Sequence, residues 1–422
     1  MKKNKTIINK TDWLVTLIYF ALVFMGWLNI YAAVYDGETT QRIFDLSLNS
    51  GRQLIWIGSS ILIIIAILTI DLRFYESFAY AIYGLVIGLL LLVLVAGREV
   101  AGSTSWFELG GLRLQPSEFA KFATALAVAK FMSGSMYKIV RKKDFLITIA
   151  LILFPSALIM LQGDTGTALV FGAFVIVMYR EGLNPWLIVL GLFAILIFIL
   201  TLFVGKLYLM GGIITIAVIF IALGSKRLKR ILLIMSAAAA VAIMVLSVDY
   251  FVSEILRPHQ QNRIKALINP SGDPLGYGWN VTQSKIAIGS GGMMGKGFLN
   301  GTQTIYGFVP EQSTDFIFCT LGEEQGWIGS LVIIGLFVIL LTRLVALAER
   351  QKSRFARIYG YSVASIIFIH FMVNIGMTIG LFPVIGIPLP FFSYGGSSLW
   401  SFTILLFIFL KLDAHRAQIL FR

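Results

Sequence analysis

The chain has 422 residues, of which 58% are hydrophobic and only 13% are charged, and its mean hydropathy is +0.87. This composition excludes an ordinary soluble domain. Apolar runs of about 20 residues recur along nearly the whole chain, and such runs are typical of membrane-spanning helices rather than of barrel strands. We therefore predict an all-α polytopic integral membrane protein that forms one domain over residues 1–422.

The apolar runs predict the membrane spans in chain order. They lie at 13–34, 53–70, 77–96, 118–133, 145–162, 167–179, 186–204, 207–224, 231–249, 314–342, 358–382 and 399–411. We expect a bundle of ten to twelve transmembrane helices. The first run is followed by no convincing cleavage site and by many further spans, so we interpret it as a retained anchor.

The formal net charge of +13 is explained by where the basic residues lie. With the N-terminus in the cytoplasm, the N-terminal segment, the C-terminal tail and the alternate loops on that side carry most of the Lys and Arg. This bias accounts for most of the charge without a nucleic-acid partner, and it places both termini in the cytoplasm. The residues concerned are Lys2, Lys3, Lys5, Lys10, Lys138, Arg141, Lys142, Lys143, Lys226, Arg227, Lys229, Arg230, Arg343, Arg350, Lys352, Arg354, Arg357, Lys411, Arg416 and Arg422.

Three segments on the opposite, external side are too long or too unusual to be plain connections. They are 97–117, 250–313 and 383–398. The second is a large extracytoplasmic loop rich in Gly, Asn and Gln. The third, PVIGIPLPFFSYGGSS, has a proline-broken backbone, which membrane depth tolerates only where protein or water lines it. We therefore predict a re-entrant loop at 383–398 and a site that opens outward.

The motifs give no support to nucleotide or zinc chemistry. The run GSGGMMGKG (289–297) matches neither a P-loop nor a dinucleotide fingerprint, so we interpret it as a flexible or tightly turned external loop. The single cysteine, Cys319, excludes an intrachain disulfide, and the histidines are too dispersed for a zinc site. We expect no nucleotide cofactor. The histidines are His259, His370 and His415.

The large external loop carries basic residues where external loops usually avoid them. One interpretation is that these side chains reach up to lipid phosphates at the interface. The other is that arginine forks and lysine charges hold a diphosphate or a similar polyanion. The residues alone leave both open; they are Arg257, Arg263, Lys265, Lys285 and Lys296.

Acidic residues near the external ends of the spans are candidate functional groups. Glu118 and Lys121 are three residues apart, so they share one helix face and suit a structural ion pair as well as chemistry. Asp164, in LQGDTGTALV, lies at the turn before a span, and Asp315, in VPEQSTDFIF, lies at the outer mouth of its span, so each could cap a helix.

Two adjacent glutamates, Glu323 and Glu324, lie deeper in the span that follows Asp315. On an ideal helix Glu323 is about 12 Å deeper than Asp315 and about 80° around the axis, whereas Glu324 is nearly opposite. The three acids therefore do not form one simple carboxylate cluster. The glutamates could instead anchor the packing of neighbouring segments, where Gly322 and Gly326 can bend the helix.

The run DPLGYGWNVTQSKIAIGSGGMMGKGFLNGTQTIYGFVPEQSTDFIFCTLGEEQGWIG (273–329) resembles the SEDS family, named for shape, elongation, division and sporulation. Its QSKIAIGSGGMMGKGFLNGTQ portion is closest to the members that act in cell elongation. Those members commonly have ten spans, so the runs near 207–249 add a hairpin to the family pattern. Further blocks resemble family motifs in the family order: GLRLQPSEFAKF, LQGDTGTA, NRIKALINPSGDPLG and GIPLPFFSYGGSS.

The resemblance implies a peptidoglycan glycosyltransferase that polymerises lipid II at the outer face of the bacterial cytoplasmic membrane. Asp315 matches the acid that the family requires, and we expect it to act as general base. The family is thought to use a divalent cation, Mg²⁺ or Mn²⁺, for which the sequence identifies no ligands. The implied partner besides membrane lipids is a class B penicillin-binding protein. The residues implied in substrate binding are Arg263, Lys285, Lys296, Gln283, Glu118, Lys121 and Asp164.

Two other functions fit part of the pattern. A flippase for the same lipid-linked precursor would also contain intramembrane charges and broken helices. A non-catalytic scaffold that recruits a transpeptidase would tolerate the substitution Asp315→Asn, whereas an enzyme that uses Asp315 as its base would not. A flippase needs charges that continue toward the inner leaflet, but the candidate residues cluster in and beside the external loops.

Overall fold

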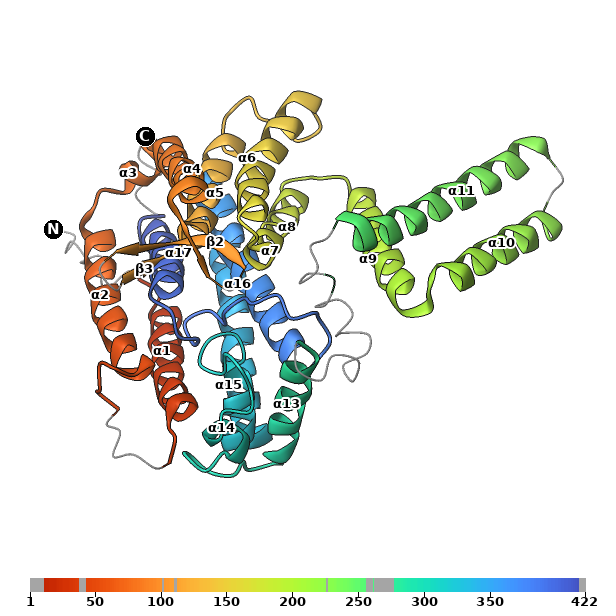
Figure 1. Ribbon diagram of the computed structural model, residues 1–422. Coiled ribbons are helices and arrows are strands. Elements are labelled where there is room, and N and C mark those ends of the chain that lie inside the picture. Colours follow the sequence, from red (N-terminus) through yellow and green to blue (C-terminus); the bar gives the residue numbers. More distant parts are fainter. Residues whose placement is uncertain are drawn as a thin grey trace. The chain divides into compact units, whose positions relative to one another are not determined.

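The computed structural model describes residues 11–37, 43–100, 102–109, 112–224, 227–255, 261 and 277–416. Figure 1 shows that long helices make up most of the structure. The helices are α1 (Trp13–Val34), α2 (Asn49–Thr69), α3 (Leu72–Ser77), α4 (Ala79–Ala96), α5 (Pro116–Met132), α6 (Lys142–Leu161), α7 (Thr165–Val170), α8 (Ala173–Arg180), α9 (Pro185–Val204), α10 (Lys206–Ala222), α11 (Leu228–Tyr250), the π-helical turn η2 (Phe251–Ile255), α13 (Tyr277–Ser290), α14 (Thr302–Ile305), α15 (Ile317–Glu349), α16 (Arg354–Thr378) and α17 (Gly396–Ala414).

The prediction of an all-α polytopic membrane protein is confirmed. Within the described ranges, nine helices are long and apolar enough to cross a membrane. Two shorter apolar stretches, Thr165–Arg180 and Lys206–Ala222, and the 17-residue α5 account for the remaining predicted spans. Every predicted span therefore coincides with helix, because a long apolar run has to satisfy its own backbone hydrogen bonds.

The starts of several helices follow from local sequence. Asp12 caps α1 by accepting a hydrogen bond from the Val15 amide at 3.2 Å. Proline occupies the first position of α5 and α9, where its missing N–H has no helical partner to lose.

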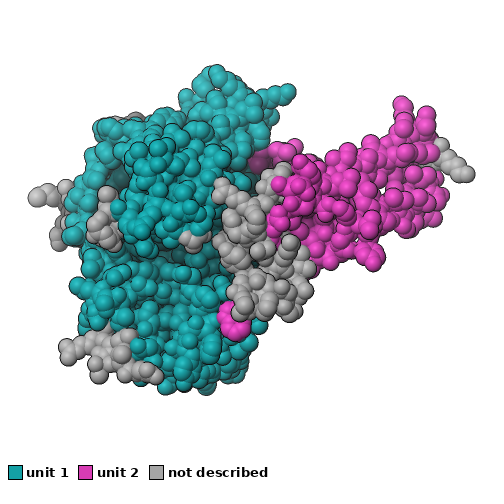
Figure 2. Space-filling model, in the orientation of Figure 1, with its two compact units in different colours: residues 1–182, 280–422 teal, residues 183–279 magenta. Residues whose placement is uncertain are grey.

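The chain divides into two compact units, shown in Figure 2. The larger unit comprises residues 1–182 and 280–422, and it holds every candidate site residue that the structure describes. The smaller unit comprises residues 183–279. There α10 and α11 pack against each other as the expected hairpin, and they expose most of their apolar side chains.

Three short strands form a small antiparallel sheet, in the order β1 (Arg98–Val100), β2 (Ser103–Leu109) and β3 (Leu112–Leu114). The all-helical prediction did not anticipate these strands within the external segment 97–117. The sheet is tied to the end of α6, since the Thr104 amide donates to the Gln162 carbonyl at 2.9 Å.

The 383–395 segment, between α16 and α17, has no helix and packs closely against the bundle. Glycines on two helices make this approach possible: a β-carbon at Gly26 of α1 would lie 2.5 Å from the Phe392 carbonyl oxygen, and one at Gly166 of α7 would collide with the Ile385 carbonyl. The segment predicted to be re-entrant is thus irregular backbone surrounded by protein, the setting in which such backbone is tolerated.

Helix α15 is interrupted at Gly326, whose φ of 64° and ψ of −155° are not helical. The 291–297 loop fits into this interruption: the amides of Trp327 and Ile328 donate to the carbonyls of Gly292 and Met293 at 2.9 and 3.2 Å. The part of the GSGGMMGKG run that follows α13 is therefore a tightly turned loop.

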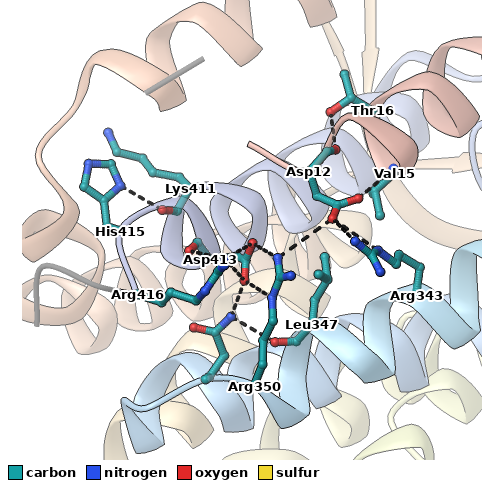
Figure 3. A network of polar contacts seen from close by, with 11 residues as sticks. Asp12, Val15, Thr16, Arg343, Leu347, Arg350, Lys411, Asp413, His415 and Arg416 are labelled. Carbon is teal, nitrogen blue, oxygen red and sulfur yellow. Dashed lines mark hydrogen bonds and ion pairs between the residues drawn. The ribbon is translucent and has the colours of Figure 1, made fainter. Parts of the chain in front are cut away.

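A polar network joins α1, α15 and α17, and Figure 3 shows it from close by. Arg343 donates to Asp12 at 2.7 Å, and Arg350 makes a two-pronged contact with Asp413 at 2.9 and 2.5 Å. Gln351 also donates to Asp413 at 2.7 Å. We call Asp12, Arg343, Arg350, Gln351, Asp413 and Arg416 the Asp12–Asp413 network. It binds the first and last long helices of the bundle to α15.

Candidate active site

Asp315 lies in the turn that leads into α15, and three consecutive carbonyl groups of this turn are held from outside it. The Tyr394 amide donates to the Ser313 carbonyl at 3.0 Å, and the Ser393 hydroxyl donates to the Thr314 carbonyl at 2.6 Å. The Asn374 side chain donates to the carbonyl of Asp315 itself at 2.9 Å. The N-cap position of α15 is Phe316, so Asp315 lies one residue before that position.

The half-buried carboxyl group of Asp315 faces the backbone of the 383–395 segment. A β-carbon at Gly386 would lie 3.1 Å from Asp315 Oδ2, and Gly386 has a φ of +70°. The positive φ favours glycine at this position, and an added β-carbon would have to displace the carboxylate oxygen by a few tenths of an ångström. A carboxylate at the mouth of a long apolar helix, fixed through its own backbone, is therefore the central group of the candidate site.

Helix α16 connects Asp315 to this segment through two side chains one turn apart. Asn374 Nδ2 donates to Ile387 O at 2.8 Å as well as to Asp315 O. His370 Nδ1 lies 3.1 Å from Pro388 O. Both side chains are fully buried. Sequence reasoning did not assign either residue to the site, although two hydrogen-bonding side chains four apart in an apolar span are a signal that could have found them.

Glu118 and Lys121 form the ion pair that their spacing suggested. Lys121 Nζ donates to Glu118 Oε2 at 2.8 Å, and the two residues are 1% and 2% exposed. The same ammonium lies 3.0 Å from His370 Nε2 and 4.4 Å from the centre of the Phe402 ring. The pair is thereby connected to the helix that holds Asp315.

Asp164 caps α7, as its position in the sequence indicated, because Oδ1 accepts from the Thr167 amide at 3.0 Å. Its other oxygen, Oδ2, accepts from Gln115 Nε2 at 3.0 Å and from the Ser117 hydroxyl at 3.1 Å. Asp164 therefore joins the start of α7 to the start of α5, which carries Glu118 and Lys121.

Lys285 and Gln283 lie on α13, which is attached to the end of α16 by a 2.9 Å hydrogen bond from Ser284 to the Thr378 carbonyl. Lys285 is exposed and Gln283 is mostly buried. The ammonium of Lys285 lies against Gly380, where an added β-carbon would be 2.5 Å from Nζ. Thr378 is one turn beyond Asn374, so α16 positions both α13 and Asp315. Arg263, the other predicted cation of the large loop, lies outside the described residues.

Lys296 has a different partner from the one expected. Its ammonium lies 2.6 Å from Oε1 of Glu323, a side chain with no exposed surface. Glu323 also accepts hydrogen bonds from the amides of Gln303 and Thr304 at 2.9 Å. Lys296 therefore takes part in an ion pair that its place in the sequence did not indicate, and its role in substrate binding stays a prediction.

The paired glutamates anchor the 291–305 region to α15, in agreement with the packing interpretation. The carbonyl groups of Glu323 and Glu324 accept from the amides of Lys296 and Gly297 at 3.0 and 2.9 Å. Both glutamate side chains are buried. Gly295 is required here as well, since a β-carbon would collide with the Glu324 carbonyl.

The described part of the chain offers no group of three or more His, Cys, Asp or Glu side chains that could hold a metal ion. The divalent cation that the resemblance implies therefore stays a prediction, since such an ion can also be held by one or two carboxylates together with substrate phosphates.

The fold and this arrangement define a polytopic helical membrane protein whose candidate catalytic carboxylate lies at the mouth of a long helix. The family model described as "Cell cycle protein", for FtsW, RodA and SpoVE, matches residues 12–215 and 192–418. The chain belongs to this family, the same SEDS family that its motifs resemble.

Curated relatives extend over nearly the full chain. The peptidoglycan glycosyltransferase RodA of Treponema pallidum is 30% identical over 96% of this chain and 98% of its own length. The peptidoglycan glycosyltransferase MrdB of Escherichia coli K12 is 33% identical over 87% of this chain and 86% of its own length.

Two solved structures share the fold. One belongs to a study of how a peptidoglycan synthase complex coordinates polymerisation and crosslinking; it matches with a TM-score of 0.69 and 27% identity, over 97% of this chain and 99% of its own. The crystal structure of RodA from Thermus thermophilus matches with a TM-score of 0.62 and 26% identity, over 96% and 97% of the two chains.

Proposed function

We propose that this chain is a peptidoglycan glycosyltransferase that polymerises lipid II at the outer face of the cytoplasmic membrane during cell elongation. The activity is the one by which its relatives are named. The observation that carries the residue assignment is the fixing of Asp315 by Ser393, Tyr394 and Asn374, because a general base has to be held where the reacting hydroxyl arrives.

The proposed reaction is a single displacement. A sugar hydroxyl of the acceptor attacks the anomeric carbon of the donor, and the bond between that carbon and the lipid diphosphate breaks. The hydroxyl proton passes to the carboxylate of Asp315, and the bonding electron pair leaves with the diphosphate oxygen. A single displacement inverts an α-linked donor to a β-linked glycan.

The diphosphate is a good leaving group that requires charge stabilisation more than protonation. Lys285 is the described cation best placed for this role, since it is exposed and its helix is attached to α16 one turn from Asn374. Arg263 is proposed as its companion from the sequence resemblance. If a divalent cation takes part, the oxygens of the diphosphate would bind it.

The proposed partner is a class B penicillin-binding protein, which supplies the transpeptidase activity. This proposal is supported by the similarity to a chain solved in the context of a peptidoglycan synthase complex. The excess of Lys and Arg on one side of the predicted spans supports a cytoplasmic location for both termini.

The test is polymerisation of purified lipid II by this protein with its transpeptidase partner, comparing wild type with Asp315→Asn. The matched control is Glu311→Gln, an equivalent change at an exposed acid of the same turn. We expect product from the wild type and the control and none from a folded Asp315→Asn protein. Equal product from Asp315→Asn would overturn the base assignment. No product from any protein, with the partner present, would favour the flippase or the scaffold.

A further inference from the structure

We propose that Asn374 is a positioning residue for Asp315, acting through the backbone rather than on the substrate. This inference rests on the proposed function, because it assumes that Asp315 is the base. Asn374 is fully buried on α16, and its carboxamide lies between two backbone carbonyls that are distant in the sequence.

The carboxamide of Asn374 has a single workable orientation. Nδ2 carries two hydrogens, and they are donated to Asp315 O at 2.9 Å and to Ile387 O at 2.8 Å. In the opposite orientation the amide oxygen of Asn374 would face the two carbonyl oxygens. Neither of them can donate a hydrogen bond to it. Asn374 therefore clamps the Asp315 turn to the 383–395 segment with both of its donors.

His370 supports the clamp from one turn away. The carbonyl of Pro388 can only accept, so His370 Nδ1, 3.1 Å away, has to carry the proton. Nε2 then carries no proton and accepts a hydrogen bond from the Lys121 ammonium, 3.0 Å away. An ammonium group can only donate, so this assignment suits both partners. The carbonyls of Ile387 and Pro388 are consecutive, so the two side chains together fix the stretch that follows Gly386.

This arrangement determines where the carboxylate of Asp315 lies. The backbone at Gly386 lies against Oδ2 of Asp315. Ile387 follows Gly386, and Asn374 donates both to the Ile387 carbonyl and to the Asp315 carbonyl, so it fixes the distance between these two backbone groups. Without Asn374, the carbonyls of Asp315 and Ile387 lose a hydrogen-bond donor, and the turn that contains Asp315 can move relative to the 383–395 segment. A misplacement of about 1 Å in a catalytic group lowers rates by about a hundredfold.

The substitution that tests the clamp is Asn374→Leu, which keeps the size of the side chain and removes both donors. Its matched control is Asn29→Leu on α1, where an equally buried asparagine donates within its own helix, to Met25 O at 2.9 Å. Lipid II polymerisation is measured with the transpeptidase partner and normalised to folded protein, across a range of pH.

We expect Asn374→Leu to lower kcat between about tenfold and a hundredfold and to move the acidic midpoint of the pH–rate profile. Because the rates are normalised to folded protein, a loss of folded enzyme changes neither kcat nor the midpoint, and we expect neither to change in Asn29→Leu. An unmoved midpoint for Asn374→Leu, or a kcat within twofold of wild type, would overturn the clamp. If Asn374→Leu does not fold, Asn374→Gln applies the same criteria with the carboxamide displaced by one methylene.

Asp315→Asn is measured in the same series and separates the two proposals. If Asp315→Asn retains activity, the base assignment fails, and the positioning role fails with it. If Asp315→Asn is inactive while Asn374→Leu keeps both the wild-type midpoint and kcat, the positioning role fails alone and the proposed function stands.

Discussion

Gly386 approaches Asp315 so closely that a β-carbon at position 386 would lie 3.1 Å from the carboxylate oxygen Oδ2. The φ of +70° favours glycine there, and an added β-carbon would displace the carboxylate by a few tenths of an ångström. The GIPLP segment therefore contributes its backbone to the candidate site. Its first residue, Gly386, has no side chain and so leaves room for the carboxylate of Asp315.

We expect Gly386→Ala to lower the rate of lipid II polymerisation by at least about tenfold, because the methyl group displaces the carboxylate from its position. The left-handed backbone also destabilises alanine by about 1–2 kcal/mol. Gly205→Ala separates these effects: Gly205 has a φ of +80°, and an added β-carbon there meets nothing within 4 Å. Equal losses of specific activity in the two variants would assign the Gly386 effect to backbone strain alone.

The ion pair between Lys296 and Glu323 predicts that these residues act on stability rather than on substrate affinity. Lys296→Met leaves the buried Glu323 carboxylate without its cation, so we expect a lower melting temperature. In a double-mutant cycle with Glu323→Gln, the coupling free energy should be about 0.5–3 kcal/mol.

Lys285→Met is the comparison for this prediction, because Lys285 is exposed and is proposed to bind the diphosphate. We expect it to raise KM for lipid II while leaving the melting temperature near that of the wild type. A raised KM in Lys296→Met, with an unchanged melting temperature, would return Lys296 to the substrate site.

The buried pair of Lys121 and Glu118 predicts an asymmetric response to substitution. Lys121→Met removes the cation and leaves a carboxylate that is 2% exposed, which should lower the free energy of unfolding by about 3–5 kcal/mol. Adding Glu118→Gln removes the orphaned charge, so we expect the double variant to regain part of that loss. Thermal unfolding of the purified proteins measures both. A double variant less stable than Lys121→Met would contradict this account.

Asp12 predicts a pH-dependent contribution to stability. Burial alone would raise the pKa of Asp12, but hydrogen bonds from Arg343 and the Val15 amide outweigh it and hold the pKa below its ordinary value of 3.8. A carboxyl with a lowered pKa stabilises the folded state above the unfolded pKa, and this stability is lost as the pH falls through the folded pKa.

We therefore expect Asp12→Asn to lower the free energy of unfolding by about 1–3 kcal/mol at neutral pH. The difference from wild type should decrease as the pH falls below 3.8 and vanish once the pH is below the lowered pKa of the folded state. Thermal melts across this range measure it. Asp249→Asn, which removes the half-exposed ion pair with Lys206, is the control and should change stability by less than about 1 kcal/mol. A difference for Asp12→Asn that persists at the lowest pH would show that the charge of Asp12 is not its cause.

Sequence reasoning succeeded where the physical cause is local. The spans follow from apolar runs, the pairing of Glu118 with Lys121 from a spacing of three residues on a helix, and the capping role of Asp164 from its place before α7. Each of these relationships is set within one continuous stretch of the chain.

The sequence did not predict contacts made across the bundle. Asn374 reaches a carbonyl 59 residues earlier, and Lys121 meets a histidine 249 residues later. The contact between Lys296 and Glu323 joins residues that are 27 positions apart, and the sequence did not indicate it. The strands at 98–114 were missed as well, because they are short and their apolar pattern is weak. These features depend on how helices pack, which periodicity does not encode.

The Asp12–Asp413 network also has a bearing on the order in which the molecule assembles. Asp12 and Arg343 are 331 residues apart, so the first helix leaves the ribosome long before its partner exists. Contacts of such large sequence separation form late, because the intervening chain has to be closed first. The ends of α1, α15 and α17 are therefore joined in one of the last steps of folding, after the helices between them have been synthesised.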